Sequence, residues 1–89
     1  MKQVICNFSL FDMQQTVYIF DDEANTYEAV GTCTLEDVGK VIANVCFAHN
    51  IDNVHLYGQS KFAESILCDI DTHSNCSAYS NGMIHVEVN

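Results

Sequence analysis

The spacing of apolar residues changes at Thr34, and this change constrains the fold more than any other feature of the sequence. Before Thr34 apolar residues recur at every second position, most clearly at Val4, Cys6, Phe8 and Leu10, which is typical of a half-buried strand. After Thr34 they recur at every third or fourth position, which is typical of a helix that packs by one face. The chain is therefore expected to begin with strands and to continue with helices.

Three strands are expected before Thr34, at residues 2–10, 16–20 and 26–33. The second is rich in β-branched and aromatic residues, which favour strands. Because the links between the three strands are short, the strands should form an antiparallel meander.

Two helices alternate with two strands after this meander. Thr34 can cap the first helix, which should run to about His49, and Ser60 can cap the second. The strands are expected at residues 53–57 and 83–88. Both helices should bury a stripe of apolar side chains against the sheet.

The segment between the second helix and the last strand, residues 72–82, is polar. Its few apolar residues follow neither the alternation of a strand nor the spacing of a helix. We expect mainly a loop here. The pair Asn81-Gly82 is a strong turn signal, which leaves open an additional short strand from Ser77 to Ser80.

These elements predict a single α/β domain, of the α+β type, that spans residues 1–89. Its order is βββαβαβ: an antiparallel meander followed by two crossover helices, around a five-stranded mixed sheet. Right-handed crossovers that move the same way along a sheet place both helices on one face. A chain of 89 residues has room for one such core and not for a second domain.

This element order resembles the core of the ribonuclease H-like fold, over almost the whole chain. The segment from Asn53 to Ser60 looks like the fourth strand of that fold and the turn after it. It is also similar to small uncharacterised bacterial and phage proteins. The resemblance implies a sheet order of 3-2-1-4-5. In larger members a C-terminal helix covers the second face of the sheet, and no such helix is expected here.

The residues that carry the activities of this superfamily are missing. Its nucleases hold two metal ions with carboxylates, the first of them in the middle of the first strand. Residues 3–11 contain no acid, and Asp52 precedes the fourth expected strand instead of ending it. ATP-binding relatives have a glycine-rich first hairpin, whereas residues 10–16 contain no glycine. We therefore expect no nuclease activity, no catalytic residue and no cofactor.

The charge of the chain and its cysteines indicate which kinds of partner it can bind and in which compartment it is expected. The chain has three lysines, no arginine and twelve carboxylates, which give a net charge of −9. This charge disfavours direct binding to nucleic acid or to anionic membranes, and it leaves a basic partner possible. No apolar run is long enough to span a membrane. The five cysteines are odd in number and lack a CxxC pair, which indicates reduced thiols in a cytoplasmic protein.

The face of the sheet without helices is the main candidate for a binding surface. The residues that alternate with the core set should lie on it, together with the polar Asn7, Ser9 and Glu87. The expected interaction residues are Ile5, Tyr18, Phe20, His55, Tyr57, Met83 and His85. This face is either a solvated surface or a docking surface for another protein or a second copy.

Two histidines on the same face suggest a different function. His55 and His85 should share this face on adjacent strands and are weak candidates for a metal or acid/base pair, near Tyr57 and Glu87. No third ligand is identifiable, so surface histidines are the simpler interpretation.

Asp21, Asp22 and Glu23 form an acidic tip, which is typical of an ordinary solvated turn but also of a protein that imitates nucleic-acid phosphates. The sequence thus favours a non-enzymatic protein–protein interaction module, such as a phage-type accessory protein. The alternatives are an acidic decoy of a nucleic-acid-binding protein and a small histidine-based metal or enzyme site.

Overall fold

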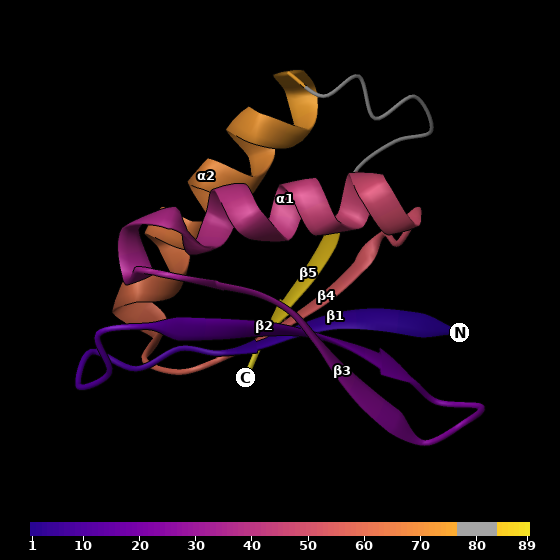
Figure 1. The fold of residues 1–89 in the computed structure, drawn as a ribbon. Coiled ribbons are helices and arrows are strands. Elements are labelled where there is room, and N and C mark those ends of the chain that lie inside the picture. Colours follow the sequence, from indigo (N-terminus) through magenta and orange to yellow (C-terminus); the bar gives the residue numbers. More distant parts are fainter. Residues whose placement is uncertain (77–83) are drawn as a thin grey trace.

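The sheet is built from five strands, and two helices follow its meander (Figure 1). The structure is a computed structural model that describes residues 1–76 and 84–89. Met83 and the possible strand from Ser77 to Ser80 lie outside the described residues. In chain order the elements are β1 (Lys2–Asn7), β2 (Gln15–Asp21), β3 (Thr26–Cys33), the 3-10 turn η1 (Leu35–Asp37), α1 (Val38–His49), β4 (Asn53–Tyr57), α2 (Ser60–Cys76) and β5 (His85–Val88).

The strand order is β3-β2-β1-β4-β5. β1 lies in the centre, where it pairs antiparallel with β2 and parallel with β4. β3 extends the antiparallel side, and β5 extends the parallel side. The predicted five-stranded mixed sheet with its βββαβαβ layout is therefore confirmed.

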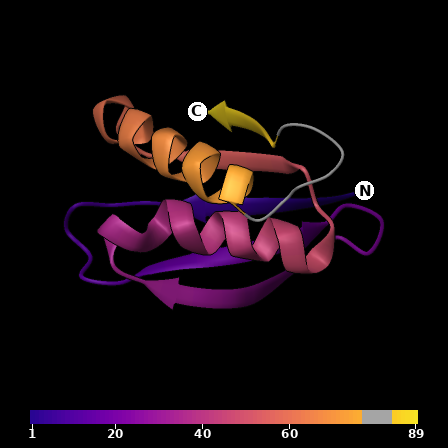
Figure 2. The same ribbon diagram turned by 90° about the horizontal axis from the view of Figure 1, so that it is seen from above.

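Both helices lie on the same face of the sheet (Figure 1) and run side by side when seen from above (Figure 2). α1 carries the chain from β3 to β4 and α2 carries it from β4 to β5, so both connections advance in one direction along the sheet. Right-handed connections of this kind must use the same face. Among the described residues, no element covers the opposite face.

The core lies between the helices and the residues that alternate along the strands. Burial removes apolar side chains from water, and each large one contributes about 1.5–3 kcal/mol. The sheet contributes Val4, Cys6, Val17, Ile19, Val54 and Leu56, and the helices contribute Val38, Ile42, Val45, Cys46, Ala63, Ile66 and Ile70. Within the described ranges, no helix is long and apolar enough to cross a lipid bilayer.

Three element boundaries differ from the sequence-based prediction by three residues or more. α1 begins at Val38, because residues 35–37 form a 3-10 turn and the Thr34 side chain makes no capping hydrogen bond. β1 ends at Asn7, because the Ser9 amide donates to the side-chain oxygen of Gln15 at 2.9 Å and not to a backbone carbonyl of a neighbouring strand.

α2 continues to Cys76, through residues that were expected to form a loop. Its polar side chains bond back to the helix: the Thr72 hydroxyl donates to the Cys68 carbonyl at 2.9 Å, and the Ser74 hydroxyl donates to the Asp71 carbonyl at 3.1 Å. Hydroxyl side chains of this kind can remain within a helix, so polarity alone did not mark its end.

The two helices pack closely against each other at Gly39. A Cβ atom added at this position would lie 2.5 Å from the Asp69 Cβ and 2.8 Å from the Ile66 carbonyl oxygen. Contacts this short force backbone to move, because a carbonyl oxygen cannot rotate away as a side chain can. Gly39 therefore sets the distance between α1 and α2.

Gly39→Val should lower the free energy of unfolding by about 2–3 kcal/mol, because overpacking would separate the helices. Urea unfolding followed by circular dichroism measures this change. Lys40→Val is the matched control, since it places the same residue at an exposed position of the same helix. Equal losses for the two variants would show that the helices do not meet at Gly39.

Candidate functional site

The uncovered side of the sheet, called here the open face, displays a mixture of aromatic and polar side chains. Strand register places the residues on it: Ile5 pairs with Tyr18 on one side and His55 on the other, and Asn7 pairs with Tyr57. The open face includes Gln3, Ile5, Asn7, Tyr18, Phe20, Tyr27, Asn53, His55, Tyr57, His85 and Glu87. Of the predicted interaction residues, all except Met83, which lies outside the described residues, are therefore on this face.

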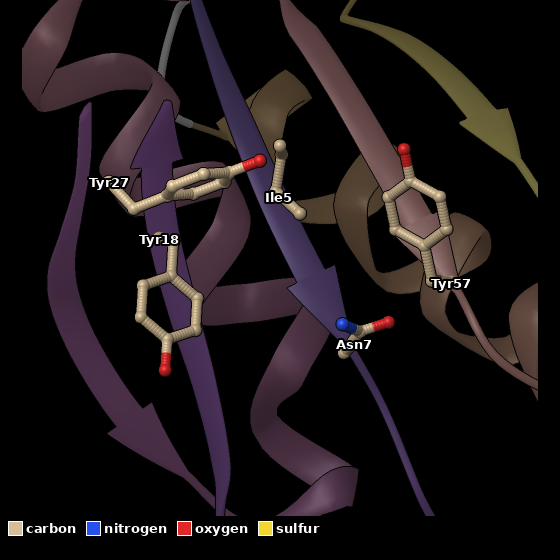
Figure 3. Close-up of a pocket in the computed structure, with 5 residues that line it drawn as sticks. All are labelled: Ile5, Asn7, Tyr18, Tyr27 and Tyr57. Atoms are coloured by element: carbon tan, nitrogen blue, oxygen red, sulfur yellow. The ribbon is translucent and has the colours of Figure 1, made fainter. Parts of the chain in front are cut away.

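A shallow pocket of about 360 Å³ lies in the middle of the open face. Ile5 and Asn7 of β1 form its centre (Figure 3). Tyr18 and Tyr27 flank them on one side and Tyr57 on the other. These five residues are called the tyrosine pocket. The set contains no carboxylate, lysine, arginine or histidine.

Tyr27 is the one pocket residue that the sequence did not place on this face. The β2–β3 register shifts between Val17 and Tyr18, so that Val30 is an extra residue on β3 and a β-bulge forms. The signal that could have found Tyr27 is the hairpin turn itself. Counting back from the Asp21–Thr26 pair places Phe20 opposite Tyr27.

Phe20 supports the ring of Tyr27 from the neighbouring strand. The two ring centroids lie 4.6 Å apart with the planes tilted by 32°, and such aromatic pairs contribute about 0.5–1.5 kcal/mol beyond their buried area. Tyr27 is 64% exposed and Tyr57 is 38% exposed. The open face therefore presents ring surface to solvent from an ordered sheet.

The two candidate metal-binding histidines share the open face but face different partners. His55 lies opposite Glu87, with its Nδ1 atom 3.3 Å from a carboxylate oxygen, and His85 lies opposite Asn53. Within residues 1–76 and 84–89, no group of three histidine, cysteine or acidic side chains could hold a metal ion. The contact between His55 and Glu87 links β4 to β5 and needs no metal to explain it.

The acidic tip is a structured turn between β2 and β3. The Met1 ammonium group lies 2.6 Å from a carboxylate oxygen of Asp22. This hydrogen bond lowers the pKa of Asp22 and raises that of the amino group. The Glu23 amide donates to the Asp21 carboxylate at 3.1 Å. The acids at the tip thus have contacts within the chain, as in an ordinary turn.

The opposite end of the sheet carries a loop held by one buried side chain. Gln15 is 2% exposed. Its amide oxygen accepts from the Ser9 amide at 2.9 Å, and its Nε2 donates to the carbonyls of Ser9 and Asp12 at 2.7 and 3.0 Å. The loop displays Phe11, which is 93% exposed, and Met13, which is 90% exposed. Gln15 therefore fixes the backbone under this apolar tip.

Two of the cysteines are part of the core, as the sequence indicated. Cys6 and Cys46 are buried, and burial raises the pKa of each thiol from 9.0 to about 12. Cys33 is half-buried and its pKa is also raised by burial, whereas Cys68 is exposed. Since the thiolate is the reactive form, Cys6 and Cys46 are unsuited to nucleophilic chemistry in the folded protein.

The two buried thiols should make the fold sensitive to alkali. The folded state keeps their protons up to about pH 12, whereas the unfolded chain releases them near pH 9.0, so stability present below pH 9.0 is lost as the pH rises towards 12. At about pH 10.5 the loss should be about 2 kcal/mol for each thiol. Urea unfolding at about pH 8 and pH 10.5 measures it.

The free energy of unfolding of Cys46→Ala should decrease less steeply with pH than that of the unchanged protein. It should nevertheless be lower than that of the unchanged protein at both pH values. Cys68→Ala should keep the full slope, because that thiol is exposed. An unchanged slope in Cys46→Ala would contradict the assignment.

Comparison of the sequence with protein-family models and with curated proteins found no match. The function must therefore be inferred from the surface of this chain.

Proposed function

We propose that this protein is a non-enzymatic interaction module that binds a basic partner protein through the open face. The observation that carries the proposal is the tyrosine pocket, which lies at the centre of a sheet face that no described element covers. Tyrosine combines a large apolar ring with a hydroxyl that hydrogen-bonds water before binding and the partner afterwards. For this reason it is enriched at the centre of protein interfaces.

The composition of the open face supports a protein partner over a purely solvated surface. An antiparallel sheet tolerates one wet face, but such a face is normally polar. Here Ile5, Phe20 and three tyrosines lie together, with His55, His85 and Glu87 towards one edge. An apolar centre with a polar border is the usual anatomy of a transient interface.

Charge supports a partner of different sequence. The chain carries a net charge of −9, so two copies would repel each other over any shared face, whereas a basic protein would be attracted before contact. The resemblance to small phage proteins and to the ribonuclease H-like core supports a phage-type accessory protein that acts on a host protein. The cysteine usage supports action in the cytoplasm.

The double variant Tyr18→Ser/Tyr57→Ser should weaken binding of the partner at least about tenfold, because it removes two central rings. A protein captured from lysate must first be purified and its binding reconstituted in isothermal titration calorimetry. The matched control is Phe11→Ser/Phe47→Ser, which removes two exposed aromatic rings outside the open face. The control variant should bind the partner as tightly as the unchanged protein. Added salt should weaken binding of the partner to the unchanged protein.

Two outcomes would overturn the proposal. The first is a reconstituted partner that the control variant loses and the open-face variant keeps. The second is a dimer in analytical ultracentrifugation that the open-face variant converts into a folded monomer, since a second copy would then occupy the face.

A further inference from the structure

We propose that the tyrosine pocket takes an arginine side chain of the partner. This inference rests on the function proposed above and names the group that the pocket receives. The pocket volume of about 360 Å³ lies at the lower end of the range of about 300–1,000 Å³ for sites that enclose small ligands. It fits one long side chain inserted from a partner surface, and it is too small for a secondary-structure element.

The centre of the pocket suits the aliphatic part of such a side chain. Ile5 is half-buried and lies between the strands that carry the tyrosines. The methylene groups of an arginine can pack on this apolar surface while the charged end remains partly hydrated.

The surrounding groups suit a guanidinium. Figure 3 shows the rings of Tyr18 and Tyr57 broadside on either side of β1, so that each offers a ring face to an incoming group. A planar cation stacks on such faces, and arginine does this better than lysine. The tyrosine hydroxyls and the Asn7 amide oxygen can accept hydrogen bonds, and a guanidinium has five N–H donors. The hydroxyl of Tyr27 points towards Ile5 and adds an acceptor close to the centre.

Electrostatics distinguishes arginine from the alternatives. Among the residues that the structure describes, no positive side chain lines the pocket, and the net charge of −9 attracts a cation to the whole molecule. An acidic side chain would be repelled. An aliphatic side chain such as leucine would fill the space but would leave the Asn7 amide and the hydroxyls without partners, which costs affinity.

The test uses the folded protein and small probes, so it needs no identified partner. Binding of N-acetyl-arginine methylamide is followed by NMR, through the ring signals of Tyr18 and Tyr57 and the methyl signals of Ile5. The neutral isostere N-acetyl-citrulline methylamide and the apolar N-acetyl-norleucine methylamide are titrated in parallel. The arginine probe should bind weakly and saturably, about threefold to fivefold more tightly than citrulline, which matches one cation–ring interaction.

Variants assign that preference to the ring. Tyr18→Leu/Tyr57→Leu should remove most of the difference between arginine and citrulline, whereas Tyr18→Phe/Tyr57→Phe should keep it, because the ring faces remain. Phe47→Leu is the matched control, since it removes an exposed ring of α1 outside the open face. It should leave both affinities unchanged.

Equal binding of arginine and citrulline would overturn the arginine assignment, and so would tighter binding of norleucine or the absence of any saturable shift at these residues. Each of these results concerns the pocket ligand alone. The role of the open face is tested separately, by the reconstituted partner and the Tyr18→Ser/Tyr57→Ser variant, so a failure of the arginine assignment can be distinguished from a failure of the proposed function.

Discussion

The direction of the two crossover connections determines most of the structure. Because α1 and α2 advance the same way along the sheet, both must lie on one face. They fit there together only because Gly39 lets one helix backbone approach the other. The same constraint exposes the other face of the sheet, where the alternate residues of each strand lie and which no described element covers. The core and the open face are thus two results of one topological choice.

In the proposed interaction module, the open face combines solvent exposure with apolar area for a partner. Tyrosine, histidine and asparagine keep it hydrated, while Ile5 and Phe20 give it apolar area that a partner can bury. An entirely aliphatic face would invite non-specific association. The negative charge of the chain adds repulsion between copies, which is consistent with the proposed basic partner.

The sequence predicted those parts of the fold that depend on regular periodicity. The alternation along β1 and the helical stripe after Thr34 were enough to predict the order of the elements. They also predicted most of the residues on the open face. The missed features depend on individual contacts: Gln15 ends β1 through its side chain, and hydroxyls sustain the last turns of α2. The hairpin pairs Tyr27 with Phe20 and so places it on the open face. The bulge at Val30 changes the alternation along the rest of β3, so counting in twos from Cys33, which packs against the core, puts Tyr27 on the wrong face. The pocket could therefore be predicted only in part.

The same bulge has a second effect, at the rim of the sheet. β3 is an edge strand of eight residues, and the backbone groups on its outer side are a template for pairing with other chains. The extra residue at Val30 interrupts the regular hydrogen-bonding repeat, and Glu28 adds a charge to the same strand. A second molecule adding its own strand would meet both obstacles. The bulge at Val30 thus makes the outer edge of β3 a poor template for a further strand.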